Sequence, residues 1–173
     1  PGQTVGGAVW SMARYFTNLT NAIVMTLCLA VAFRGRWPGS SIPAAVTVWI
    51  VAVGLVYHAL LSATHDPRGL AAVSNIGMHT VVPLGVLGLW LAAAPKQGLT
   101  LRQPVLWTAW PLGYAIYALV RGQIEGAFPY FFLDPGDIGT LGVVAYIAGL
   151  GVFFLGAGGL LVALAGSGRA RWT

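Results

Sequence analysis

Long apolar runs alternate with short polar connections along this chain. A helix rises about 1.5 Å per residue, so roughly 20 apolar residues cross the hydrocarbon core of a bilayer. Five runs meet this description, and we predict them as membrane-spanning helices over about 15–33, 42–62, 76–94, 104–120 and 141–165. The connections contain glycine or proline, as turns commonly do. The pattern predicts an all-α, polytopic transmembrane helix bundle that forms one domain over 1–173.

The composition agrees with a membrane protein. The 173 residues are 57% hydrophobic and 8% charged, against about 25% charged in a typical soluble domain. These values exclude a soluble domain and a disordered chain. The net charge of +5 reflects arginines in short loops beside membrane helices rather than a nucleic-acid interface. We therefore expect membrane lipids, and no nucleic acid, as partners, while the oligomeric state is left open.

Basic residues are unevenly distributed between alternate loops, which predicts the orientation of the helices in the membrane. One side holds basic residues and no acid: Arg34, Arg36, Lys96, Arg102, Arg169 and Arg171. The other side holds fewer basic residues and all four acids: Arg14, Arg68, Arg121, Asp66, Glu125, Asp134 and Asp137. We predict that the first side is cytoplasmic, with the C-terminus inside a bacterial inner membrane. A sixth helix upstream of Pro1 would place both ends of the chain inside.

Polar side chains lie at the outer ends of several predicted spans, at one depth. They are Thr17, Asn18, Asn21, His58, Asn75, His79, Thr80, Arg121 and Glu125. Ionisable side chains within a membrane are costly and usually face a bundle interior or a water-filled cavity. We therefore predict a site between helices near the outer leaflet.

Thr17 and His79 are the candidate catalytic pair. A threonine hydroxyl is a weak nucleophile until a base takes its proton, and histidine is suited to that task near neutral pH. The other polar residues at this depth are candidates for binding the substrate or supporting the site. Asn18, Asn75 or N–H groups at helix starts would hold an oxyanion, and Asp66 or Glu125 would orient the histidine. A substrate arriving from the lipid would be an ester or amide with long acyl chains.

Other interpretations of the same residues remain open. Thr17, Asn18 and Asn21 are also typical of helix caps and helix contacts. His58 and His79 would alternatively ligate a haem in an electron carrier. A small transporter or a structural membrane protein is a third alternative. The aromatic run "AFPYFFLD" is most simply an interfacial belt, and alternatively it covers the site. No two histidines or acids share i, i+4 spacing on a helix, so the sequence predicts no metal site.

Three stretches of the chain resemble a known family. In order they are "RYFTNLTN", "SNIGMHTVVP" and "GYAIYALVRGQIEGAFPYFFLD". They resemble segments of the androgen-induced gene 1 and androgen-dependent TFPI-regulating proteins and their small bacterial relatives, and "GMHT" is the most specific part. The resemblance implies a helical membrane fold, usually with six spans. It also implies a cofactor-free, threonine-dependent hydrolase of lipid esters, in particular fatty acid esters of hydroxy fatty acids.

The resemblance assigns the nucleophile to Thr17 and the catalytic histidine to His79. The reasoning from residue type and depth leads to the same two residues. Animal members of the family carry histidines near the position that Arg121 and Gly122 occupy here, so no role of those histidines is transferred to this chain.

Overall fold

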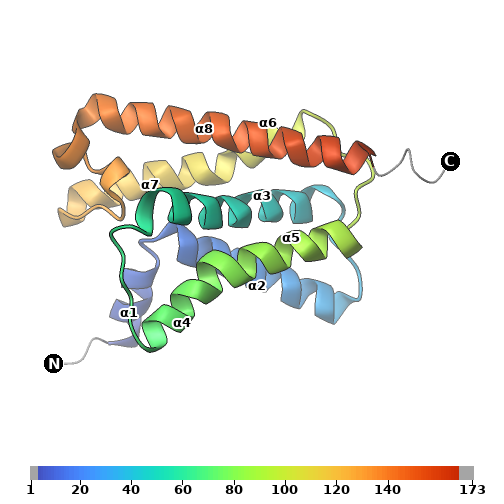
Figure 1. Cartoon of the computed structure of the whole chain (residues 1–173), viewed down its shortest axis with the longest axis horizontal. Helices are drawn as coiled ribbons and strands as arrows, with labels where there is room; N and C mark the ends of the chain where they lie inside the picture. Colours follow the sequence, from blue (N-terminus) through green and yellow to red (C-terminus); the bar gives the residue numbers. More distant parts are fainter. Residues whose placement is uncertain (1–3, 168–173) are drawn as a thin grey trace.

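The computed structural model describes residues 4–167, which form helices joined by short loops (Figure 1). In chain order the helices are α1 (Val5–Met12), α2 (Phe16–Arg34), α3 (Ser41–Val56), η1 (Tyr57–Leu61), α4 (Leu70–Ile76), η2 (Gly77–Val81), α5 (Val82–Ala93), α6 (Gln103–Trp107), α7 (Ala109–Glu125), η3 (Phe131–Leu133) and α8 (Pro135–Ser167). α3 and η1 form one continuous rod, and so do α4, η2 and α5. These residues contain no β-strand, so the predicted all-α class is confirmed.

Four rods are long and apolar enough to cross a membrane: Phe16–Arg34, Ser41–Leu61, Leu70–Ala93 and Pro135–Gly166. The last is the most apolar, with a mean hydropathy of 2.3, yet only 17% of its apolar window is buried inside the protein. A helix that is apolar all round and is not covered by protein is typical of a membrane span. The fold is thus compatible with an integral membrane protein.

The predicted span over 104–120 is not one of these rods. The chain there is divided at Thr108 into α6 and α7, and α7 has 17 residues. α7 also carries Arg121 and Glu125 in its last turns, and such charged groups are costly within lipid. The predicted count of five spans is therefore not confirmed. A sixth helix upstream of Pro1 falls outside the described residues.

One rod begins earlier than the hydrophobic pattern predicts. The third begins at Leu70 rather than at 76, directly after Gly69, whose positive φ of 59° turns the chain into the helix. The last rod opens with a turn at Pro135, which Asp134 Oδ1 supports by accepting the N–H of Gly136 at 2.7 Å. Gly139, with a φ of 72° and a ψ of 160°, interrupts this turn, so the regular helix begins after Gly139, close to the predicted start at 141. The start of the third rod was thus misread as loop.

α3 is the central element of the bundle. It contacts α2 and α5 on one side and α8 on the other (Figure 1). Its span is 56% buried, against 17–22% for the other three rods. Small residues such as Ala44 and Ala52 allow close packing around Trp90, which is 1% exposed. The end of α3 that contains Ala44 is therefore packed firmly against its neighbours.

Two rods contain a π-turn at the same end of the bundle, in η1 and in η2. A π-turn joins an N–H to the carbonyl five residues earlier. The N–H of Ser62 donates to the Tyr57 carbonyl at 2.8 Å, and the N–H of Val82 donates to the Gly77 carbonyl. Such turns are rare and are frequently found at functional sites. The side chains of η1 and η2 are therefore candidates for a functional site.

Gly54 lets α3 approach η2 closely. A β-carbon at position 54 would lie 2.8 Å from the backbone oxygen of His79 and 3.3 Å from the ring of Pro83. Since a backbone yields little, we expect Gly54→Ala to separate α3 from η2 and to lower the free energy of unfolding by about 1–3 kcal/mol. Thermal unfolding in detergent micelles measures this loss. The matched control is Gly85→Ala, because a β-carbon there meets no atom within 4 Å. Equal unfolding midpoints for the two variants would contradict the prediction.

Candidate active site

Thr17 and His79 lie in contact, although 62 positions separate them in the sequence. Thr17 is the second residue of α2, and His79 is the middle residue of η2. The distance from Thr17 Oγ1 to His79 Nε2 is 3.3 Å. Thr17 is only 9% exposed, so its hydroxyl is largely shielded from solvent. The two residues that the sequence singles out for chemistry are thus brought together by the fold.

The other ring nitrogen of His79 defines which tautomer the site holds. Nδ1 lies 3.0 Å from the backbone oxygen of Asn75, one turn earlier. A carbonyl oxygen only accepts hydrogen bonds, so the neutral ring carries its proton on Nδ1. Nε2 then presents a lone pair to the Thr17 hydroxyl and accepts its hydrogen bond. A general base needs this arrangement.

Tyr57 holds the imidazole from its face. The two ring centroids are 3.9 Å apart and the planes differ by 22°. The Tyr57 hydroxyl accepts a hydrogen bond from Asn75 Nδ2 at 2.7 Å. Asn75 therefore binds the imidazole through its backbone and the tyrosine through its side chain. These contacts together restrict the His79 ring to one orientation.

The acids that the sequence offered for orienting the histidine have other partners. Asp66 pairs with Arg68 in an exposed loop, with 3.0 Å between Oδ2 and Nη2. Glu125 pairs with Arg14 and Arg121. The backbone oxygen of Asn75, and neither of these acids, is the partner of His79 Nδ1.

His58 and Thr80 form a second histidine–threonine contact, with 3.0 Å between Nε2 and Oγ1. It joins η1 to η2 on a more exposed side of the bundle, and His58 lies edge-on to Tyr57 with ring centroids 5.2 Å apart. The haem alternative needs ring nitrogens of both histidines. Nε2 of His58 and Nε2 of His79 each already face a threonine hydroxyl.

Asn18 and Asn21 stabilise the start of α2. Asn18 Nδ2 donates to the backbone oxygen of Met12 at 2.9 Å, and Asn21 Nδ2 donates to that of Thr17 at 2.9 Å. The first contact ties α2 to the end of α1, and the second lies within α2. Both asparagines therefore help to hold the backbone that carries Thr17.

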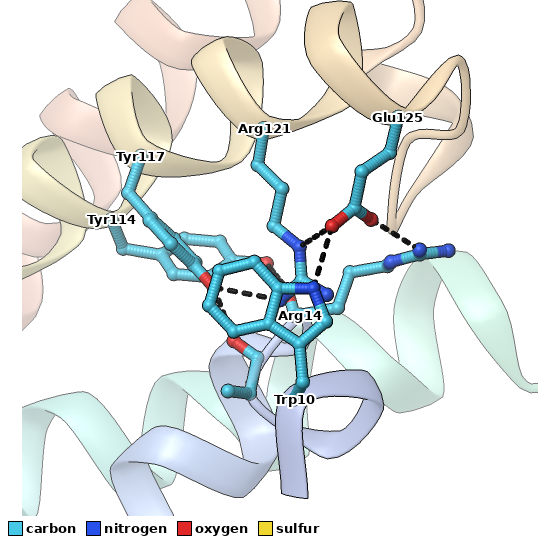
Figure 2. A network of polar contacts seen from close by, with 7 residues as sticks. Trp10, Arg14, Tyr114, Tyr117, Arg121 and Glu125 are labelled. Carbon is cyan, nitrogen blue, oxygen red and sulfur yellow. Dashed lines mark hydrogen bonds and ion pairs between the residues drawn. The ribbon is translucent and has the colours of Figure 1, made fainter. Parts of the chain in front are cut away.

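Arg121 and Glu125 belong to a polar network that fastens the chain just before Thr17 (Figure 2). Glu125 accepts hydrogen bonds from Arg14, from Arg121 Nε at 2.8 Å and from Trp10 Nε1 at 2.8 Å. The Arg121 guanidinium lies 4.0 Å from the centroid of the Trp10 ring, within the range of a cation–π contact. Trp10 comes from α1, a short helix that the sequence analysis did not predict.

Two tyrosines of α7 bind the same segment through its backbone (Figure 2). Tyr114 Oη donates to the carbonyl of Arg14 at 2.7 Å, and Tyr117 Oη donates to that of Ala13 at 3.1 Å. Arg121 Nη1 donates in turn to Tyr117 Oη at 2.7 Å. Because this segment leads directly into α2, the network fixes the position of the α2 start and hence of Thr17. Arg121 and Glu125 are thus positioning residues.

Thr17 lies where two cavities meet. The first is a narrow apolar cavity between α2, α3, α7 and α8, with a volume of about 80 Å³, smaller than the range of about 300–1,000 Å³ for small-molecule sites. The second is a polar groove between the start of α2, η1 and the α4–η2 rod. Four residues line both: Thr17, Tyr57, Leu61 and Tyr130. His79 lines the groove and is not among the residues of the apolar cavity.

Tyr130 is a site residue that sequence reasoning did not assign. It comes from the loop after α7, and its hydroxyl accepts the N–H of Phe16 at 3.1 Å, at the start of α2. Burial raises the pKa of this hydroxyl, and hydrogen bonds from the backbone N–H groups of Thr17 and Phe16 only partly oppose that effect, so it keeps its proton at neutral pH. Its signal in the sequence is the aromatic run "AFPYFFLD", several residues of which line the two cavities.

Comparison with family models, curated proteins and solved structures finds no match to this chain. The resemblance to the androgen-induced gene 1 family therefore stays an expectation from the sequence. The functional argument depends on the geometry of the site itself.

Glu125 should make the stability of the protein depend on pH. Hydrogen bonds from Arg121, and from Arg14 and Trp10, hold the pKa of this carboxyl below its usual value, which is about 4.3. Its stabilising contribution is therefore complete above that value and is lost as pH falls through the lowered pKa of the folded state. We expect the thermal unfolding midpoint of the wild type in detergent to decrease as the pH is lowered from about 5 to about 3.

The control for this prediction is Glu125→Gln, which lacks the titrating group. It should unfold at a lower temperature than the wild type at pH 7, and the difference should shrink toward pH 3. A constant difference over the whole range would show that the carboxylate charge has no part in the network.

Proposed function

We propose that the protein is a membrane-embedded hydrolase of lipid esters, with Thr17 as nucleophile and His79 as general base. The observation that carries the proposal is the 3.3 Å contact between Thr17 Oγ1 and His79 Nε2, with Nδ1 turned to the Asn75 carbonyl. This geometry supports transfer of the hydroxyl proton to a neutral imidazole. The family resemblance of the sequence supports the same pair and suggests fatty acid esters of hydroxy fatty acids as substrates.

The first half of the reaction forms an acyl ester of Thr17. Oγ1 bonds to the ester carbonyl carbon while its proton passes to His79 Nε2, and the carbonyl oxygen becomes an oxyanion. When this intermediate collapses, the bond from the carbonyl carbon to the alcohol oxygen breaks. His79 Nε2 then gives its proton to the leaving alcohol oxygen.

The second half releases the acid. A water molecule from the polar groove adds to the acyl carbon, and His79 Nε2 takes a proton from it. The bond to Thr17 Oγ1 then breaks, and His79 returns the proton to that oxygen. The products are a carboxylic acid and the enzyme in its starting state, so the cycle consumes only water.

The surroundings of His79 suit the positive charge that it carries during the cycle. The hydrogen bond from Nδ1–H to the Asn75 carbonyl becomes charge-assisted when the ring is protonated. The stacked face of Tyr57 offers a further favourable contact for a cation. A part-buried backbone carbonyl and an aromatic face would thus replace the carboxylate of better-known triads.

The hydroxyl of Tyr130 is the candidate donor to the oxyanion. It lines both cavities beside Thr17 and accepts the Phe16 N–H, which leaves its own proton to donate. We expect Tyr130→Phe to lower kcat by about 10²–10³-fold, because one oxyanion donor is lost while the ring remains. Stopped-flow or steady-state hydrolysis of a lipid ester measures kcat and KM. A rise in KM with kcat unchanged would contradict this role.

We further propose that the site lies toward the outer leaflet of a bacterial inner membrane, with the C-terminus in the cytoplasm. All four acids lie in the loops or helix ends at the Thr17 end of the rods, whereas Arg34, Arg36, Lys96 and Arg102 lie toward the other end. The positive-inside rule supports this orientation. Arg169 and Arg171, which also entered the count, lie outside the described residues.

The first test is release of fatty acid from a long-chain fatty acid ester of a hydroxy fatty acid in detergent micelles. We expect the wild type to release it, and Thr17→Ala to be slower by about 10³-fold or more. His79→Ala should lose about 10²–10⁴-fold, the usual contribution of a general base. Thr17→Ser should keep partial activity, because it retains a hydroxyl.

The matched control is His58→Ala. His58 contacts Thr80 and not Thr17, so the variant should keep most of the activity. Each variant is compared by its unfolding midpoint to confirm that it folds. Hydrolysis by folded Thr17→Ala at the wild-type rate would exclude the proposed nucleophile.

A further inference from the structure

We infer that the apolar cavity beside Thr17 binds the acyl chain of the ester. Gly151 of α8 has no side chain and so leaves space in this cavity, and this space sets the longest acyl chain that fits. The inference rests on the proposed function, since it assigns the two halves of the ester to the two cavities. The alcohol half would lie in the polar groove.

The position of His79 decides which half of the ester enters which cavity. The leaving alcohol must receive its proton from His79 Nε2, so its oxygen must face that nitrogen. His79 lines the polar groove and is not among the residues that line the apolar cavity. The alcohol therefore departs through the groove, and the acyl group bonded to Thr17 extends to the other side, into the apolar cavity.

The chemistry of the cavity wall suits a hydrocarbon chain. Away from its mouth, the wall consists mainly of aliphatic and aromatic side chains from α3, α7 and α8. The hydroxyls of Thr108 and Tyr114 are directed to the backbone oxygens of Val105 and Arg14, at 2.6 and 2.7 Å. Each of these hydroxyls has therefore used its proton within the protein. An acyl chain is the part of a lipid ester that gains most from such a wall.

The cavity has a limited depth. Its lining runs from Tyr114 of α7 back to Thr108, the residue before that helix, six residues away, which is about 9 Å at the helical rise. Phe154 and Ala52 lie at the deep end and are 6% and 2% exposed. A chain that enters beside Thr17 therefore meets protein after a limited number of carbons. The site should accept acyl groups up to a maximum length.

Gly151 is the position at which this length can be changed with the least disturbance. It lines the cavity from the middle of α8, and a β-carbon added there meets no atom within 4 Å. Its φ is not among the positive values of the chain, so the helix accepts any ordinary side chain. A larger residue at 151 would occupy the cavity without moving the backbone.

The experiment uses the graded series Gly151→Ala, Gly151→Val and Gly151→Leu. Each variant is assayed on methyl esters of increasing acyl length and on acetate esters of increasing alcohol length. We expect the acyl-length limit to shorten step by step, with the long-to-short kcat/KM ratio at least tenfold lower in Gly151→Leu. The alcohol-length profile should stay that of the wild type.

Gly156→Leu is the matched control on the same helix. Gly156 is exposed, a β-carbon there also meets no atom within 4 Å, and it is not among the residues that line the cavity. This variant should keep the wild-type acyl profile. Profiles of Gly151→Leu and Gly156→Leu that coincide would overturn the inference, and a shift in the alcohol profile alone would reverse the assignment of the two halves.

A binding measurement separates this inference from the proposed function. Displacement of a fluorescent fatty acid by acids of increasing length is measured in Thr17→Ala, with and without Gly151→Leu. Length-dependent binding that Gly151→Leu shortens supports the acyl cavity even if the wild type hydrolyses no ester, in which case only the proposed function fails. Hydrolysis by the wild type together with binding that Gly151→Leu does not change overturns the cavity and leaves the proposed function intact.

Discussion

The hydrogen bond between His79 Nδ1 and the Asn75 carbonyl is the interaction on which the geometry of the site and its proposed chemistry depend. It places the ring proton on the side away from Thr17, and it leaves Nε2 free to accept from the hydroxyl. The π-turn in η2 carries His79 at the level of Thr17, and Gly54 allows α3 to press against the backbone oxygen of His79. The π-turn in η2 and the absence of a side chain at Gly54 thus both help to place His79 beside Thr17.

The nucleophile side of the pair is fixed by a different set of forces. Thr17 stands in the first turn of α2, where helix ends tend to fray. Tyr114 and the Arg121–Glu125 pair bind the chain immediately before it, through backbone oxygens and the Arg14 guanidinium. A hydrogen bond between side chains of two different rods forms only if both rods are held in position. The polar network at the end of α7 therefore matters to the site although it does not touch His79.

The arrangement of polar and apolar space around Thr17 gives the proposed reaction a direction. The His79 ring lines the groove together with other polar side chains, whereas the cavity behind Thr17 is lined mainly by aliphatic and aromatic side chains. An ester that bridges the two has its reactive carbon at the boundary, because one half is stabilised by removal from water and the other by polar contacts. In this arrangement the two parts of the substrate lie in different cavities, and the nucleophile and the base lie where the two cavities meet.

The sequence by itself determined the helical class and four long apolar rods, because length and hydrophobicity are local properties of the chain. It also indicated Thr17 and His79, since polar groups at one depth of a bundle are rare enough to stand out. It did not show that 104–120 divides at Thr108 into α6 and α7, or that the charged end of α7 pairs with Trp10 and Arg14. Only the tertiary structure decided the pairing of Oγ1 with Nε2, the parts played by Tyr57 and Tyr130, and the cavity behind Thr17. Those features form where side chains distant in the sequence come into contact, and no single stretch of the chain predicts these contacts.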